Sequence, residues 1–277
     1  MRPEDHADLV LRALAEDLGD RGDITTMSVI PAEARSGANI VSRGPGVIAG
    51  LELAGYVFSH VDSSINYERL KGDGESVAAG AVLARVSGSS RSILTAERTA
   101  LNILGRMSGV ASATARFVDA VAGTDSRITD TRKTLPGFRA LDKIAVVAGG
   151  GVNHRMGLYD EVMIKDNHIV AAGSIVGAVG SARRALGPDM VIVVEVDRLS
   201  QLDEVLGTTA NQVLLDNMDI ETLATAVARV DGAMTTEASG GVNLETVQAI
   251  ARTGVDLISV GAITHSAPQL DVALDFL

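Results

Sequence analysis

Positive charge is concentrated in one segment of a chain that is acidic overall. The 277 residues carry a formal net charge of −11 and include only four lysines. Three of these lysines, four arginines and two of the five histidines fall in the segment that begins at Arg127 and ends at His168. They are Arg127, Arg132, Lys133, Arg139, Lys143, His154, Arg155, Lys165 and His168. Cations that converge on one pocket need an anionic ligand to offset their desolvation. We therefore expect an anion-binding site here; a solvated basic face is the alternative.

The residue types in this segment indicate which anion would bind. The planar guanidinium of arginine meets a carboxylate with two parallel hydrogen bonds, so Arg132 and Arg155 favour a dicarboxylate. Three successive glycines at 149–151 precede His154. Glycine lets the backbone approach a ligand closely, although a flexible loop is the alternative reading of this run.

Acidic and glycine-rich positions follow later strand-like runs. Glu195 and Asp216 each stand at the end of such a run. Two carboxylates near phosphates suggest Mg²⁺, which prefers oxygen ligands and shares them with phosphates; pairing with a nearby arginine is the alternative. Two further turns have the composition of a backbone phosphate cradle. Their residues are Ser239, Gly240 and Gly241 in the first turn and Val260, Gly261 and Ala262 in the second.

Alternating strands and helices are expected to position these groups. The strand-like runs are 127–131, 161–165, 190–196, 212–217, 235–239 and 256–264, and the helix-like stretches are 174–186, 199–206, 220–230 and 244–252. Asp219 and Asn243 stand at N-cap positions, and glycines at 187, 207, 232 and 254 follow the helices. Repeated β-then-α units with apolar strands predict a parallel sheet buried on both faces. A barrel is favoured over a doubly wound open sheet, and in both folds the site lies at the carboxyl ends of the strands.

The first half of the chain reads as a separate α+β module. Residues 4–18 predict an amphipathic helix that ends at Gly19, and residues 35–43, 47–50 and 82–87 predict strands. Residues 93–121 predict a long helix, weakened at Gly105 and Gly109. We place the domain boundary within this long helix.

Composition excludes several classes of function. The chain has no cysteine, which excludes disulfides, thiolate metal sites and cysteine nucleophiles. Its negative charge disfavours nucleic acid and anionic membrane surfaces as partners. The first five residues have no signal-peptide character, and no apolar run approaches the roughly 20 residues that span a bilayer. We therefore expect a cytoplasmic protein.

Taken together and in order, these motifs resemble the quinolinate phosphoribosyltransferase family. The resemblance rests on residues 16–19, 22–26, 96–102, 130–134, 149–155, 164–168, 195–197, 215–217 and 237–241. Leu135 departs from the family, which often has a small polar residue there. Each motif alone is weakly specific, but their combined order along nearly the whole chain is highly specific.

The family resemblance implies a particular architecture. An N-terminal α/β sandwich domain, residues 1–107 joined by the C-terminal segment 266–277, would accompany an incomplete (open) α/β barrel formed by residues 108–265. It also implies a homodimer with a shared active site, in which Arg98 reaches into the partner's site; whether dimers assemble into hexamers stays open. Arg98, Asn102 and Arg106 have i, i+4, i+8 spacing, which predicts one polar stripe on a helix. A surface stripe of salt bridges is the alternative reading.

The same resemblance implies a reaction. Phosphoribosyl pyrophosphate would react with quinolinate to give nicotinate mononucleotide, pyrophosphate and CO₂, a step of NAD biosynthesis. The quinolinate-binding set would be Arg98, Arg132, Lys133, His154, Arg155 and Lys165. Glu195 and Asp216 would hold Mg²⁺ or the ribose hydroxyls, and the two glycine turns would hold the 5′-phosphate. Lys133 or Lys165 would stabilise the carbanion left by decarboxylation, and the sequence does not decide between them.

Two alternative functions remain. A related pyrophosphorylase acting on another aromatic acid would keep the barrel but lose part of the dicarboxylate cluster. A non-catalytic barrel would bind a phosphosugar without turnover. The complete cationic set and the paired carboxylates favour quinolinate over both.

Overall fold

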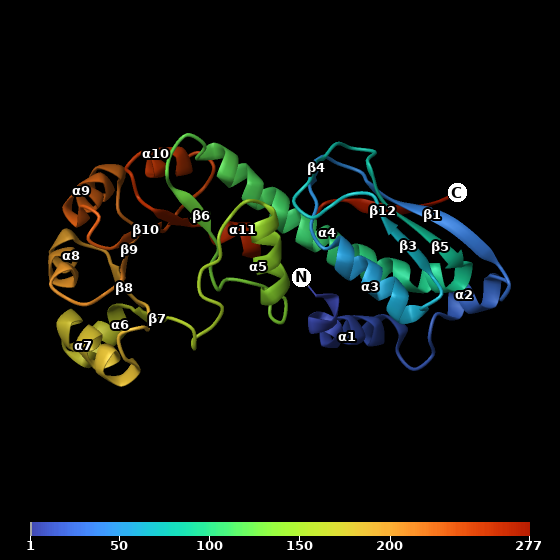
Figure 1. Ribbon diagram of the computed structural model, residues 1–277, viewed down its shortest axis with the longest axis horizontal. Helices are drawn as coiled ribbons and strands as arrows, with labels where there is room; N and C mark the ends of the chain where they lie inside the picture. The colour runs from blue at the N-terminus through green and yellow to red at the C-terminus, as the bar shows by residue number, and fades with distance from the viewer. Residues whose placement is uncertain (1) are drawn as a thin grey trace. The chain divides into compact units, whose positions relative to one another are not determined.

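The computed structural model describes residues 2–277, which form two compact units (Figure 1). Within the described residues, the first unit comprises residues 2–115, Leu135–Gly150 and Ala267–Leu277, and the second comprises Arg116–Thr134 and Gly151–Ser266. The division expected from the sequence, 1–107 with 266–277 against 108–265, differs from these units chiefly at Leu135–Gly150. This segment interrupts the second unit in sequence and belongs to the first.

The first unit is built around an antiparallel sheet. Its helices are η1 (Pro3–His6), α1 (Ala7–Leu18), α2 (Ile24–Val29), α3 (Leu51–Val61), α5 (Arg139–Ala148) and most of α4 (Ser90–Ala120). Its strands are β1 (Arg35–Ser42), β2 (Gly46–Val47), β3 (Asn66–Arg69), β4 (Ser76–Val77), β5 (Val82–Ser89) and β12 (Val272–Phe276). The main sheet has the order β12-β1-β5-β3, and β2 pairs with β4. The C-terminal strand β12 thus pairs with β1, in the register Ile40 opposite Leu274.

Helix α4 is continuous through both of its glycines. The long helix predicted at residues 93–121 is confirmed, and it runs unbroken from Ser90 to Ala120 across both glycines, where the sequence predicted a weakness. Both glycines instead make room for the C-terminal segment of the same unit. A Cβ atom at Gly105 would lie 2.9 Å from the carbonyl oxygen of Leu270, and one at Gly109 would lie 2.9 Å from the Cα of Gln269. The absence of a side chain therefore lets the returning chain lie directly against the helix.

The expected polar stripe on α4 is also corrected. Arg98 and Asn102 are exposed, but Arg106 is buried. Its guanidinium makes two hydrogen bonds to the carboxylate of Asp142 in α5, at 3.1 and 3.0 Å. Asp142 is fully buried, and burial raises the pKa of its carboxyl group although the bonds from Arg106 oppose this change. Arg106 therefore connects α4 to α5 within the first unit and is not part of a surface stripe.

The second unit is an open parallel barrel. Its strands are β6 (Arg127–Thr129), β7 (Val162–Ile164), β8 (Ile192–Val196), β9 (Gln212–Asp216), β10 (Thr235–Ser239) and β11 (Leu257–Ser259). They form one parallel sheet with the order β6-β11-β10-β9-β8-β7. All six expected strands are present, and β6 and β7 form the two edges of the sheet. The predicted incomplete α/β barrel is confirmed.

Helices follow the strands, and the longer ones cover the outside of this sheet (Figure 1). They are α6 (Asp166–Ala172), α7 (Ile175–Leu186), α8 (Leu199–Leu206), α9 (Ile220–Val230), α10 (Val247–Ala251) and α11 (Ala262–His265). Asp219 caps α9 as expected, since its side chain accepts a hydrogen bond from the Thr222 amide at 2.8 Å. Asn243 does not cap α10. Its side chain closes a turn on the amides of residues 245 and 246, so the helix begins only at Val247.

No single helix among residues 2–277 is long and apolar enough to cross a membrane. The pair α6 and α7, which is bent by 87°, passes the same test of length and composition when the two helices are joined.

Candidate active site

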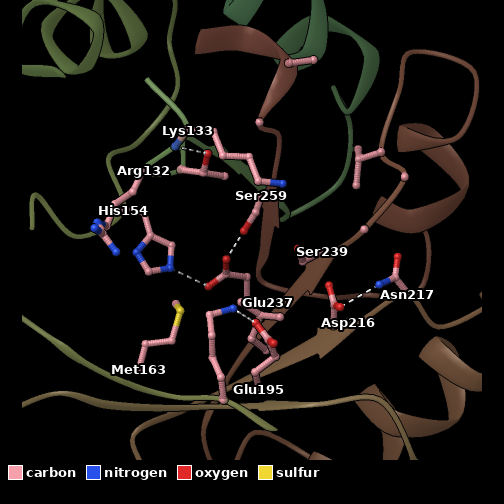
Figure 2. A pocket seen from close by; sticks show the side chains of 18 of the residues that line it. Arg132, Lys133, His154, Met163, Glu195, Asp216, Asn217, Glu237, Ser239 and Ser259 are labelled. Atoms are coloured by element: carbon pink, nitrogen blue, oxygen red, sulfur yellow. Dashed lines mark hydrogen bonds and ion pairs between the residues drawn. The ribbon is translucent and has the colours of Figure 1, made fainter. Parts of the chain in front are cut away.

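A cavity of about 890 Å³ lies in the second unit, where the strands of the parallel sheet end (Figure 2). Its wall comes from the residues after β6, the loop before β7 and the carboxyl ends of the remaining strands. The residues predicted from sequence that line it are Arg132, Lys133, His154, Arg155, Lys165, Glu195, Asp216, Ser239, Gly240, Gly241, Gly261 and Ala262. Segments more than 100 residues apart in the chain therefore contribute to one hollow, as expected for the carboxyl ends of barrel strands.

The register of the sheet brings the acidic side chains together. Glu195 on β8 and Glu237 on β10 both stand beside Leu214, which lies on the strand between them. Asp216 pairs with Ser239 two residues further along the same strands. Because alternate residues of a strand share one face, these five residues belong to one side of the sheet. That side faces the cavity, which all five residues line.

The turn after β6 supplies two of the cations. Thr131 accepts a hydrogen bond from the Lys133 amide at 3.1 Å, and the Thr134 amide donates to the Arg132 carbonyl at 3.0 Å. From α11, which follows the neighbouring strand β11, the Thr264 hydroxyl donates to the Lys133 carbonyl at 2.8 Å. The backbone that carries Arg132 and Lys133 is thus tied down on both sides.

A second loop, between α5 and β7, carries His154 and Arg155 to the same cavity. The His154 amide donates to the fully buried carboxylate of Asp130 at 2.8 Å. Arg155 donates to the Glu161 carbonyl at 3.1 Å, which leaves other N–H groups of its guanidinium for a ligand. Burial lowers the pKa of Arg155, and the charge of Arg132 lowers it further. Two neighbouring guanidinium groups that repel each other in a cavity make a site suited to an anion.

The remaining cation lies opposite the carboxylates. Lys165 follows β7, and its ammonium group forms an ion pair with Glu195. Asp216 accepts a hydrogen bond from the side-chain amide of Asn217 at 2.7 Å. The cavity therefore has a cationic side, formed by Arg132, Lys133 and Arg155, and an acidic side, formed by Glu195 and Asp216.

The first glycine turn begins where β10 leaves the sheet. Gly240 and Gly241 have φ angles of 95° and 61°, which favour glycine. A Cβ atom at Gly240 would also collide with Asn217. Such a turn exposes successive backbone amides and is suited to phosphate.

In the second predicted turn, Gly261 and Ala262 line the cavity but Val260 does not. Val260 is fully buried, and its amide donates to the carbonyl of Thr129 on β6 at 2.9 Å. The lining of the cavity therefore gives no support to a place for Val260 in the phosphate cradle, and that role stays a prediction. The backbone of Val260 still belongs to the sheet, whose strand β11 ends one residue earlier.

Arg98 belongs to the first unit, where it stands on α4 with its side chain exposed. The second unit holds the cavity. A role for Arg98 at the site stays a prediction.

Several lining residues were not predicted, and the most informative are Glu237, Asn217, Ser259 and His265. Glu237 had a signal in the sequence, since a charged residue in the middle of a strand that is expected to be buried is costly and calls for a reason. Ser259 had none, because its importance depends on the neighbouring strand. Its hydroxyl donates a hydrogen bond to the Glu237 carboxylate (Figure 2).

Comparison with known proteins gives consistent results over the whole chain. The model of the quinolinate phosphoribosyl transferase C-terminal domain matches residues 110–275, and that of the N-terminal domain matches residues 23–108. The nicotinate-nucleotide pyrophosphorylase (carboxylating) of Mycobacterium leprae is 47% identical over 273 residues, which cover 97% of this chain and 96% of the relative.

Solved structures agree with these sequence matches. NadC from Streptococcus pyogenes has a TM-score of 0.96 and 34% identity, covering 100% of this chain and 99% of that chain. The nicotinate-nucleotide pyrophosphorylase from Francisella tularensis has a TM-score of 0.96 and 38% identity, covering 100% and 98% of the two chains.

Proposed function

Because the chain belongs to the quinolinate phosphoribosyltransferase family, we propose that it transfers phosphoribosyl from phosphoribosyl pyrophosphate to quinolinate. The products are nicotinate mononucleotide, pyrophosphate and CO₂. The observation that carries this proposal is a single cavity in which two neighbouring guanidinium groups stand across from two carboxylates and a glycine turn. One side suits a dicarboxylate, and the other suits a phosphorylated sugar.

Quinolinate would bind on the cationic side of the cavity. Arg132 and Arg155 offer planar forks for its two carboxylates, and Lys133 and Lys165 add point charges that need no fixed geometry. His154 closes this side with a ring that is almost fully buried, its side chain being 8% exposed. Held in this way, the ring nitrogen of quinolinate would face the sugar.

Phosphoribosyl pyrophosphate would bind on the acidic side. Ser239, Gly240 and Gly241 would hold the 5′-phosphate through hydroxyl and amide groups. Glu195 and Asp216 would accept hydrogen bonds from the ribose hydroxyls or hold Mg²⁺. Lys165 would exchange its partner Glu195 for a substrate carboxylate when both substrates are present.

The donor set fits Mg²⁺ bound jointly with the substrate. Residues 2–277 contain no cluster of three or more histidine or acidic groups that would form a metal site by themselves. Glu195 and Asp216 supply two oxygen ligands, and Mg²⁺ commonly takes its other ligands from phosphates and water. Once bound, the ion would neutralise negative charge on the pyrophosphate leaving group.

The reaction then needs positioning and charge stabilisation more than covalent catalysis. The ring nitrogen attacks the anomeric carbon as the bond to pyrophosphate breaks. When CO₂ departs, the electron pair of the broken bond stays on the adjacent carbon as a carbanion beside the positively charged quaternary nitrogen, and a proton then adds to that carbon. Lys133 and Lys165 are the two ammonium groups in the cavity that could stabilise this negative charge.

We further propose a homodimer in which Arg98 of one subunit completes the quinolinate site of the other. Its exposed position on α4 and its place in the first unit support this arrangement. Mixing an Arg98→Ala variant with a Lys165→Ala variant tests it. Hybrid dimers should regain part of the activity that each variant lacks, because one site of the hybrid then has both residues. No recovery, with heterodimers shown to form, would contradict a shared site.

The test of the reaction itself is direct. Purified protein with quinolinate, phosphoribosyl pyrophosphate and Mg²⁺ should release CO₂ and form nicotinate mononucleotide in equal amounts. A related enzyme would turn over a different aromatic acid instead, and a binding barrel would retain phosphoribosyl pyrophosphate without turnover.

A further inference from the structure

Glu237 is a fully buried carboxylate in the wall of the candidate active site. Its Oε1 accepts a hydrogen bond from the Ser259 hydroxyl, and its Oε2 accepts one from the side-chain amide of Gln212. Both donors are neutral. A buried carboxylate held only by neutral donors is strongly disfavoured, because a buried charge needs an opposite charge beside it.

That opposite charge is available from His154. Its Nε2 lies 3.2 Å from Oε2 of Glu237 (Figure 2). On the other side of the ring, Nδ1 lies 2.7 Å from the Arg155 amide, which donates to it, and 3.6 Å from Oε1 of Glu161. If the ring is neutral, Nδ1 is the acceptor and Nε2 carries the proton. If the ring is protonated, both nitrogens carry protons, so Nδ1 gives up the hydrogen bond from the Arg155 amide and its proton has Glu161 as the nearby acceptor. Nε2–H faces Glu237 in both states.

Carboxylates surround this ring on three elements. Glu237 is on β10, Glu161 precedes β7 and Asp130 follows β6. The guanidinium groups of Arg132 and Arg155 line the same cavity. Burial disfavours the charged imidazole, but Glu237, then Glu161 and Asp130, outweigh burial and raise the pKa of His154. The surroundings therefore favour the imidazolium.

We propose that Glu237 is a positioning residue that orients His154 through Nε2–H and acts as its counter-ion. Glu237 then acts on quinolinate only through His154, which presents positive charge to the dicarboxylate. This inference rests on the proposed function and adds a residue that the known motifs leave without a role. The proposal also predicts whether removing the charge of Glu237 weakens or tightens quinolinate binding. A Glu237 that lacked a cationic partner would repel quinolinate, and its removal would tighten binding.

Glu237→Gln tests the direction of this change in quinolinate affinity, because glutamine keeps the volume of the side chain and removes its charge. We expect the KM for quinolinate and its Kd from calorimetry to rise about tenfold to a hundredfold, the usual range for losing a charge-assisted hydrogen bond. The KM for phosphoribosyl pyrophosphate should stay within about twofold. The alkaline limb of kcat/KM should move to lower pH, because His154 would lose its proton more easily. Glu237→Asp should recover part of the loss.

The matched control is Glu204→Gln, the same chemical change at an exposed position on α8 of the second unit. It should leave every one of these quantities unchanged. A double-mutant cycle adds a second criterion. Since Glu237 acts through His154, Glu237→Gln should add little to the defect of His154→Asn. Fully additive losses would overturn the proposal.

A measurement on the unmodified protein covers the case in which Glu237→Gln does not fold. In ¹⁵N spectra of the five histidines, with His154 assigned from the His154→Asn variant, Nε2 should carry a proton across the whole pH range. A proton on Nδ1 alone would overturn the proposal, as would unchanged or tighter quinolinate binding by a folded Glu237→Gln variant. If the unmodified protein does not turn over quinolinate, it is the proposed function that fails, and the spectra still test the pairing of His154 with Glu237.

Discussion

Replacing Arg155 with methionine is the most informative single change in the cationic side of the cavity. Methionine keeps the unbranched apolar stem beside Met163, whose sulfur lies 3.7 Å from the guanidinium, and removes the charged fork. The proposed function assigns this fork to one carboxylate of quinolinate. Arg155→Met therefore removes a pair of charge-assisted hydrogen bonds while leaving the packing of the loop largely intact.

The expected size follows from the two hydrogen bonds that the variant lacks. At about 1.5 kcal/mol each, two hydrogen bonds to a carboxylate contribute about 3 kcal/mol. The repulsion between Arg155 and Arg132, which helps to lower the pKa of Arg155, acts in the free and the bound protein alike and therefore does not offset this loss. A loss of about 3 kcal/mol corresponds to about a 150-fold fall in kcat/KM for quinolinate.

The assay is steady-state formation of nicotinate mononucleotide at varied concentrations of each substrate. The effect should appear in the KM for quinolinate, whereas the KM for phosphoribosyl pyrophosphate should change less than about twofold. Arg155→Lys should lose about tenfold, because it keeps the charge but not the fork. Arg184→Met, at an exposed position on α7, is the matched control and should behave like the unmodified protein. A folded Arg155→Met variant with a quinolinate KM within threefold of normal would refute the reasoning.

Four further outcomes are expected. Gly240→Ala should raise the KM for phosphoribosyl pyrophosphate and cost about 1–3 kcal/mol of stability, because φ is 95° and the new Cβ meets Asn217; thermal unfolding and kinetics check both. Asp142→Asn should lower Tm by roughly 6–20 °C, because it removes the carboxylate charge that faces the buried guanidinium of Arg106; an unchanged Tm would contradict this. Because the pKa of His154 is raised in the folded protein, it contributes stability that is present below about pH 6.5 and is lost as pH rises through the folded-state pKa. The difference in Tm between the unmodified protein and His154→Asn should therefore shrink with rising pH. Removing divalent ions with a chelator should abolish turnover, and added Mg²⁺ should restore it; full activity after chelation would exclude the ion.

The sequence was most informative where a pattern repeats. Continuous apolar strands such as residues 212–216, each followed by an amphipathic helix, specify a buried parallel sheet without any knowledge of distant contacts. Caps such as Asp219 act over three residues and were equally predictable. The order of the site residues along the strands then followed, because the carboxyl ends of parallel strands meet at one edge.

Features that depend on distant partners could not be predicted. Spacing placed Arg106 on one polar stripe of a helix with Arg98 and Asn102, but its burial depends on Asp142, which is 36 residues away on another helix. The glycines of α4 were interpreted as helix-weakening residues, since nothing local shows that the C-terminal segment passes directly against Gly109. Helix α3 was missed altogether, because its apolar residues are buried against an antiparallel sheet whose strands are weakly patterned.

The sequence predicted which residues belong to the site better than it predicted how they pair with one another. Charge and motif order identified the cations and the two carboxylates, but the pairing of Lys165 with Glu195 and of His154 with Glu237 required the register of β8, β9 and β10. Val260 was assigned to a phosphate cradle from its neighbours, whereas its amide is used by the sheet.

A crystal structure with quinolinate bound tests the central claim most directly. We expect the two carboxylates of quinolinate to contact the guanidinium groups of Arg132 and Arg155, with the ring nitrogen facing the turn at Ser239 to Gly241. Quinolinate bound outside this cavity, or inside it with both carboxylates directed away from the arginines, would contradict the account.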